Sequence, residues 1–367
     1  MAYTTLTSIF GALNIPDDDY VFVNTFGQEA IYDATLQLLG NHNADLAAAE
    51  SIFIERETFN HISRYYLATG GRLEKVSNNT QPNAMKAIGQ WDVAYPLEEW
   101  ASKLEGTRVQ MGYMSTGQYG RHIQQVLASD VNTRRFEMLK ALFNNGGGAP
   151  RVFVDENWGN LNVQPLANGD VTLYPPIVGA EVNATSNHYL CQGFAPAAIS
   201  DVSDPYTPAI DLLEGHFGIP TAGSNMVTFI NKAQVKITEN LPSFNPIEYR
   251  FQDLGADVTR ADNYPEGLPG RVIGEYGGKC LLVRWDWIPA NYTFTVHLDA
   301  PKPLVRRIDP PGTGLTPGLQ LVSQTMEHPF RSAIWSQRFG YGVGNRLNGV
   351  VQFIDAGGSY VVPTVWQ

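Results

Sequence analysis

The sequence is poor in charged residues and in cysteine. Lys, Arg, Asp and Glu together make up 17% of its 367 residues, against roughly 25% in an average domain. The two cysteines, Cys191 and Cys280, are too few for a disulfide scaffold and too far apart for a zinc ribbon. We therefore expect a protein with reduced thiols, which buries much of its weakly charged surface against partners.

Basic residues are also in the minority, with 25 Lys and Arg against 36 Asp and Glu and a net charge of -11. A broad basic face for nucleic-acid binding is therefore not expected. No run of about 18 apolar residues occurs, and residues 1–25 contain no Lys or Arg that could start a signal peptide. The sequence thus predicts no membrane contact.

Motifs that would indicate catalysis or metal binding are absent. His188 and Cys191 have a ligand-like spacing, but no second close pair of donors completes a zinc site. Residues 273–280 lack the first Gly and the final Ser or Thr of a phosphate-binding loop, and no G-x-S-x-G motif is present. We therefore predict no catalytic residues, no cofactor and no metal.

One enzymatic alternative stays open. Two carboxylates from distant parts of the chain could form a glycosidase pair, and the 7 Trp, 17 Tyr and 17 Phe would suit sugar stacking. A monomeric, β-rich, carbohydrate-active enzyme is therefore the alternative from another functional class.

The first 110 residues divide into an acidic arm and a hairpin. Residues 1–50 contain seven acids and no base, with helical patterns at 28–39 and 44–50 separated by Gly40. Residues 51–67 and 90–104 have the pattern of two long strands around a polar tip. Because an isolated hairpin has no core of its own, something else must cover its apolar residues.

A long helix follows the hairpin. Ser115 or Thr116 supplies an N-cap, apolar residues recur at helical spacing, and the three glycines at 146–148 end the pattern. After it we expect strands at 149–153, 170–178, 225–231, 279–288 and 292–299, with helices at 208–217 and near 319–327. The predicted fold class is α+β, with the long helix packed across a sheet.

This order of elements resembles the major capsid proteins of tailed bacteriophages, which have the Hong Kong 97 fold. The stretches LPGRVIGEYGGKCLLVRWDWIPANYTFTVHLDAP (268–301) and HPFRSAIWSQRFGYGVGNRLNGVVQFI (328–354) look much like the corresponding parts of that family. The resemblance implies five segments: an N-terminal arm (1–50), an E-loop hairpin (51–110), a peripheral domain with the spine helix (111–190), an axial A-domain (191–300) and returning peripheral strands (301–367).

The resemblance also implies a structural protein that assembles into hexamers and pentamers of an icosahedral shell, in the host cytoplasm, around DNA bound without sequence specificity. The strand-like residues 20–26 begin too early for a cleaved leading domain, so the resemblance implies a separate scaffolding protein, or none, with a portal and a decoration protein as further partners. An encapsulin-type compartment is the alternative within this fold. The predicted contacts between subunits pair apolar hairpin residues with a neighbour and the acidic arm with basic residues: Ile52, Ile54, Trp91, Tyr95, Trp100, Asp17, Asp18, Asp19, Arg306, Arg307, Arg338 and Arg346.

Overall fold

The computed structural model describes residue 22, residue 75 and the segments 28–66, 90–105, 113–180, 182–218, 225–246, 268–324 and 332–367. The chain forms two compact units, each built from three separate stretches. The first unit comprises residues 1–50, 97–138 and 307–340, and the second comprises 51–96, 139–306 and 341–367. None of the described helices is both long and apolar enough to cross a membrane.

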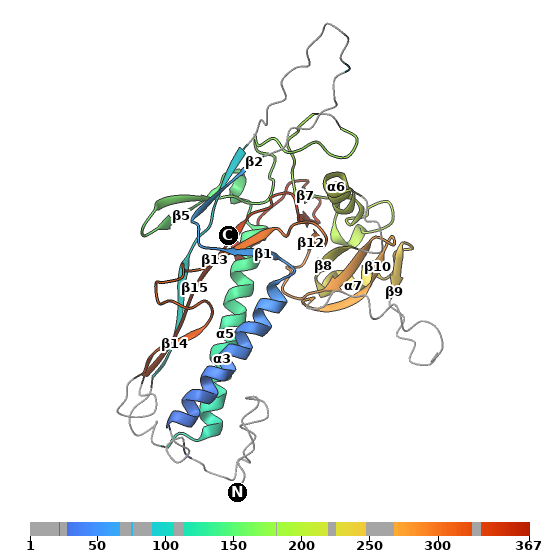
Figure 1. Ribbon diagram of the computed structural model, residues 1–367. Coiled ribbons are helices and arrows are strands. Elements are labelled where there is room, and N and C mark those ends of the chain that lie inside the picture. Colours follow the sequence, from blue (N-terminus) through green and yellow to red (C-terminus); the bar gives the residue numbers. More distant parts are fainter. Residues whose placement is uncertain are drawn as a thin grey trace. The chain divides into compact units, whose positions relative to one another are not determined.

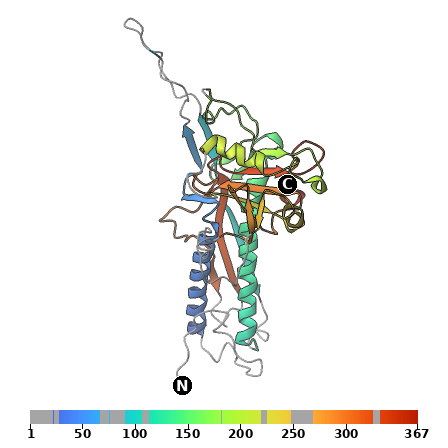
Figure 2. The ribbon, with the colours of Figure 1, turned by 90° about the vertical axis from the view of Figure 1, so that its right-hand side faces the viewer.

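The first unit packs two helices on a sheet. Helix α3 (Gln28–Glu50) lies beside α5 (Thr116–Phe143) in both ribbon views (Figures 1 and 2). Strand β15 (Ser332–Val343) pairs antiparallel with β14 (Gln320–Gln324) and β4 (Glu98–Glu105). Their shared core consists of Ile31, Leu39, Tyr119, Ile123, Val126, Leu319, Ala333 and Trp335.

Helix α5 confirms the predicted long helix and its boundaries. Ser115 and Gln118 form a reciprocal N-terminal cap: the Gln118 backbone N–H donates to Ser115 Oγ at 3.2 Å, and the Ser115 N–H donates to Gln118 Oε1 at 3.3 Å. The helix ends after 28 residues, just before the short 3₁₀ turn η1 (Gly146–Gly148), where all three glycines have positive φ.

The second unit is dominated by a seven-stranded mixed sheet in the order β7-β16-β12-β8-β11-β10-β9. Its strands β8, β11 and β12 match the predicted apolar runs and are buried along nearly their whole length. The element bounds are β7 (Tyr189–Cys191), β8 (Met226–Ile230), β9 (Phe244–Pro246), β10 (Arg271–Tyr276), β11 (Cys280–Arg284), β12 (Tyr292–His297), β16 (Val350–Phe353), α6 (Thr207–Phe217) and α7 (Lys232–Thr238).

Two separate strand pairs and part of a second sheet complete the second unit. Strand β1 (Ile54–Thr58) pairs with β13 (Leu304–Arg307) in the five-stranded sheet that has the order β1-β13-β15-β14, with β4 also paired to β15. Strand β2 (Ile62–Tyr66) pairs antiparallel with β3 (Gln90–Ala94). Strands β5 (Arg151–Asp155) and β6 (Gly159–Val163) form a hairpin of their own. The remaining short elements are the 3₁₀ turns η2 (Pro196–Ala198) and η4 (Thr364–Trp366).

The two predicted long strands are wrong in extent. Residues 51–67 contain β1 and β2, separated by a turn in which the Asn60 N–H donates to Thr58 Oγ1. Residues 90–104 contain β3 and most of β4. The two strands are separated at Pro96, which has no backbone N–H to donate in a sheet. The antiparallel pairing is therefore short, and the predicted tip at 70–84 lies outside the described residues apart from Lys75.

Three further expectations are corrected. Gly40 does not end its helix, because Leu39 and Leu46 on either side of it are buried and hold α3 in place. Residues 170–178 form no strand beyond a bridge between Tyr174 and Ala184, since two prolines follow Tyr174. Residues 320–324 form strand β14 and no helix, because they pair with β15.

Candidate functional site

The base of the β2–β3 hairpin encloses a small aromatic core in the second unit. Trp91 stacks on Tyr65 with ring centroids 5.5 Å apart, and the hydroxyls of Tyr65 and Tyr95 lie 2.9 Å apart. Burial raises the pKa of Tyr95, with the Tyr65 hydrogen bond as a second cause. Val93 and Val305 close this core. The hairpin is therefore anchored to its unit by interdigitated rings.

The outer face of the same hairpin is charged. Arg64 and Asp92 form a bidentate ion pair, with Nε–Oδ1 and Nη2–Oδ2 distances of 2.6 and 2.7 Å, and both side chains are about half exposed. The hydrogen bond from Arg64 lowers the pKa of Asp92. This pair fixes the register of β2 against β3 on the solvent side.

The predicted apolar contact residues divide into two groups. Ile52 and Tyr95 are buried within the chain itself, so their side chains are not exposed to a neighbour. Ile54, Trp91 and Trp100 are partly buried, and Trp100 lies against Phe339 with ring centroids 6.3 Å apart. Only the second group keeps accessible apolar surface.

The predicted basic contact residues are mostly engaged within the chain. Arg306 is ion-paired with Glu57, and Arg338 Nη1 lies 3.1 Å from Asp309 Oδ1. Arg307 is buried. The acidic partners predicted for them, Asp17, Asp18 and Asp19, lie outside the described residues.

Arg346 is an internal structural residue. Its guanidinium donates to the carbonyl oxygen of Pro165 at 2.8 Å and to Asp170 Oδ2 at 2.5 Å, and it lies over the ring of Tyr174. Burial alone would raise the pKa of Asp170, but the hydrogen bond and charge of Arg346 lower it. Arg346 thus ties the 165–174 loop to the chain between β15 and β16, and its side chain is buried within this chain and is not exposed to a neighbour.

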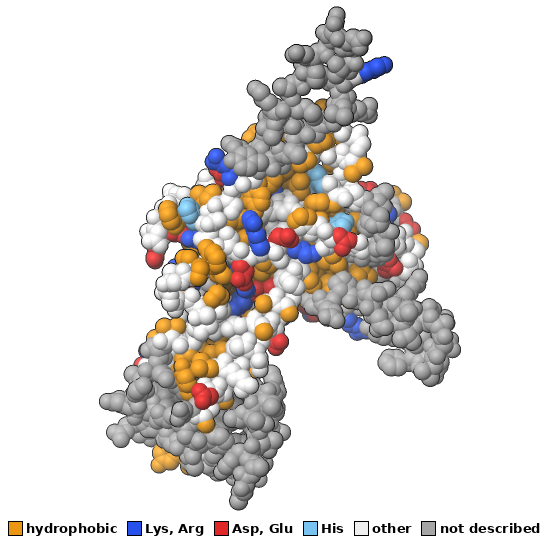
Figure 3. All heavy atoms as spheres, viewed as in Figure 1, with side chains coloured by type: hydrophobic (Ala, Val, Ile, Leu, Met, Phe, Trp, Pro, Cys, Tyr) orange, Lys and Arg blue, Asp and Glu red, His pale blue; other side chains and the backbone are white. Residues whose placement is uncertain are grey.

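A surface that sequence reasoning missed lies around the β5–β6 hairpin. Val152 and Val154 are exposed on one face of β5, opposite Asn162 and Asn160. In the hairpin turn, Trp158 stacks on His61 with ring centroids 4.0 Å apart and remains 58% exposed. Apolar side chains are visible among charged ones across much of the face in Figure 3. The alternating Val152 and Val154 of β5 are the sequence signal that could have indicated this exposed surface.

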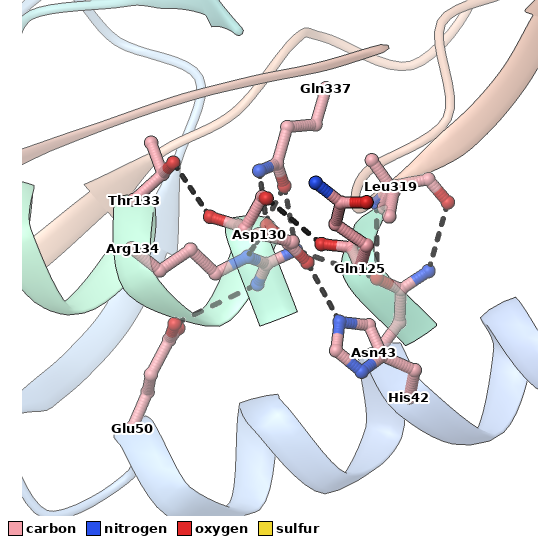
Figure 4. A network of polar contacts seen from close by, with 10 residues as sticks. His42, Asn43, Glu50, Gln125, Asp130, Thr133, Arg134, Leu319 and Gln337 are labelled. Carbon is pink, nitrogen blue, oxygen red and sulfur yellow. Dashed lines mark hydrogen bonds and ion pairs between the residues drawn. The ribbon is translucent and has the colours of Figure 1, made fainter. Parts of the chain in front are cut away.

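The first unit contains a buried polar network that the sequence did not indicate (Figure 4). Arg134 Nη2 donates to Gln337 Oε1 at 2.9 Å, and its Nε lies 3.1 Å from Asp130 Oδ1. His42 Nε2 is 2.9 Å from Asp130 Oδ2, and Glu50 Oε1 is 3.7 Å from Arg134 Nη1. The network joins α3, α5 and β15, and its members His42 and Gln337 are 295 positions apart in sequence.

The partners of Asp130 in this network determine whether its carboxyl group is protonated. Burial by itself would raise the pKa of Asp130, but the hydrogen bond with His42 and the charge of Arg134 outweigh burial and lower it. Asp130 is therefore an anion inside the unit, held by His42, Arg134 and the Gln337 amide. Among the residues that the structure describes, no group of three or more His, Cys, Asp or Glu side chains could hold a metal ion.

Comparison with known proteins identifies the fold. The chain matches no protein-family model and no curated protein sequence. A solved structure of Mycobacterium phage Patience aligns with a TM-score of 0.65 and 18% identity, over 100% of this chain and 97% of that one. The chain therefore has the fold of tailed-phage capsid proteins, the Hong Kong 97 fold, and the prediction of that fold is confirmed.

Two further solved structures align less closely. The capsid structure of the cyanophage P-SCSP1u has a TM-score of 0.48 and 11% identity, with 82% of this chain and 86% of that chain covered. The asymmetric unit of the mature capsid of bacteriophage PhiM1 has a TM-score of 0.45 and 9% identity, with 81% and 83% covered.

Proposed function

We propose that this chain is the major capsid subunit of a tailed-phage-like particle, and that its copies assemble as hexamers and pentamers into an icosahedral shell around double-stranded DNA. The observation that carries the proposal is the end-to-end match of fold with the Mycobacterium phage Patience structure. The low charge content and the exposed valines and Trp158 on the second unit support it, because a subunit of a shell must bury surface against its neighbours.

The function is tested by the assembly state of the full chain. The purified protein would be examined by light scattering and negative-stain electron microscopy over a range of concentrations, alone and co-expressed with the scaffolding gene of its genome. We expect rings, tubes or closed shells. A protein that stays monomeric under both conditions contradicts the proposal, and a monomer that cleaves a glycan would support the enzymatic alternative.

The contents of the particles separate the two kinds of shell. Particles purified from the natural source would be opened, and their nucleic acid and protein contents measured. Genome-length DNA supports a virion capsid, whose subunits are made and assembled in the host cytoplasm with scaffolding, portal and decoration proteins as partners. A shell filled with an enzyme supports the encapsulin-type alternative.

We further propose that residues 51–110 act as the E-loop and lie over a neighbouring subunit, while the arm at 1–50 reaches another copy. The support is the short β2–β3 pairing at the base of this segment together with the partly accessible Ile54, Trp91 and Trp100. Deleting residues 70–88 is expected to leave the two units folded and to abolish shell formation. Normal particles from the deleted chain, seen by electron microscopy, would contradict this role.

A further inference from the structure

A long part of the second unit carries charge of one sign only. Residues 152–231 contain eight acids and no Lys or Arg. Three of these acids are exposed: Glu156 in the β5–β6 turn, Asp201 in the loop before α6 and Asp211 on α6. Glu214 is the acid of this helix that has a basic partner, since Lys279 Nζ lies 3.0 Å from it. The helix therefore presents negative charge to solvent.

The strand register places α6 at one end of the seven-stranded sheet. Met226, Cys280, Tyr276 and His297 are aligned across four strands, at the amino ends of the parallel pair β8 and β11. Helix α6 contacts this row through Tyr206 against Tyr276 and Phe217 against His297, with ring centroids 5.1 and 5.8 Å apart. We call the row and the helix across it the acidic end.

The opposite end of the same strands is basic. Ile230, Arg284 and Arg271 are aligned at the carboxyl ends of β8 and β11, and Lys232 follows directly as the first residue of α7. Lys232 and Arg271 are exposed, while Arg284 is paired with Asp286 at 2.8 Å. We call this row the basic end; four residue steps, about 13 Å, separate it from the acidic end.

Exposed apolar residues accompany the acidic end. Val202, next to Asp201, is 97% exposed, and Val178 is 72% exposed although its backbone N–H donates to the Gly215 carbonyl of α6 at 2.8 Å. A contact here would therefore remove apolar surface from water, at about 25 cal/mol per Å², in addition to pairing charge.

Two copies cannot join through the same end, because like charges would then face each other. They can join through opposite ends, and such a head-to-tail contact repeats from copy to copy and closes into a ring when the rotation allows. We propose that the acidic end of one copy binds the basic end of the next copy. The inference rests on the proposed function, because self-assembly supplies the second copy.

Charge reversal tests the contact. One variant carries Asp201→Lys and Asp211→Lys, and the other carries Lys232→Glu and Arg271→Glu. Asp204 is left intact because it accepts the Tyr206 and Thr207 backbone N–H groups that start α6. Matched controls keep the charges: Asp201→Glu with Asp211→Glu, and Lys232→Arg with Arg271→Lys. Circular dichroism and thermal unfolding confirm that each variant is folded.

Assembly would be followed by light scattering at low salt. Each reversal alone should slow assembly about tenfold or more, whereas the controls should match the unmodified chain. The two reversal variants mixed in equal amounts should recover assembly, because every contact can again pair a basic end with an acidic one. Recovery of this kind requires alternating copies, so rings with an even number of subunits are expected in the mixture.

The outcomes separate this contact from the proposed function. An unmodified chain that assembles while both reversal variants assemble equally fast overturns the contact and leaves the capsid function standing. Reversal variants that fail alone and also fail when mixed, although folded, overturn the contact as well. An unmodified chain that remains monomeric overturns the proposed function and this contact together.

Discussion

Replacing Arg134 by Met is expected to destabilise the first unit strongly. The guanidinium is almost fully buried, and its nitrogens lie 2.9 to 3.7 Å from oxygens of Asp130, Gln337 and Glu50. Met fills much of the volume but leaves the buried carboxylate of Asp130 with fewer partners. Breaking a buried ion pair on one side costs about 3–5 kcal/mol, so the free energy of unfolding should fall by about that amount.

The same experiment has an internal control and a rescue. The Arg64→Met variant removes a pair of similar geometry that is half exposed, and exposed pairs contribute roughly 0.2–1 kcal/mol. Adding Asp130→Asn to Arg134→Met removes the buried charge that has lost its Arg partner and should recover part of the lost stability. Urea unfolding followed by circular dichroism measures all three. A loss in Arg134→Met no larger than in Arg64→Met would refute the reasoning.

Three smaller changes test other parts of the structure. A Cβ on Gly344 would lie 2.6 Å from Val305, so Gly344→Ala should lower the free energy of unfolding in urea by about 1–3 kcal/mol. Gly40→Ala in helix α3 meets no atom and should instead raise it by about 0.5–1 kcal/mol. Burial lowers the pKa of His188 from 6.5 to about 3, so stability is lost as the pH falls below about 6.5. In urea unfolding between about pH 7 and 4.5, His188→Gln should weaken this pH dependence, and an unchanged dependence would contradict the assignment. Trp158→Ser should slow shell assembly while changing the unfolding free energy by no more than about 0.5 kcal/mol; unchanged assembly would show that the Trp158 surface is unused.

The sequence predicted the elements whose signals are local. Helix α5 has its N-cap at Ser115, and the three glycines at 146–148 follow its C-terminal end. Strands β8 and β12 are continuous runs of apolar and β-branched residues. The helix predicted near 319–327 is wrong at β14. The conformation of β14 is determined by its pairing with β15, and local propensity carries no information about that pairing.

The candidate site was harder to predict for the same reason. The sequence predicts Tyr95 and Arg346 as contacts between subunits. In the structure Tyr95 is buried against Val305, 210 positions away, and Arg346 pairs with Asp170, 176 positions away. A sequence shows that a residue is apolar or charged, but its partners are fixed by topology. The resemblance of the whole chain identified the fold, whereas the role of single residues needed the strand register.

The division of the chain into units has a consequence for its synthesis. Each unit is assembled from three stretches, and the first unit needs residues up to 340, including most of β15, the strand between β4 and β14. Domains ordinarily fold one by one as the chain emerges from the ribosome. Here neither unit can complete its fold until nearly all of the chain has been synthesised. A chain that ends before residue 340 therefore lacks both complete units, and under the proposed function it could not serve as a shell subunit.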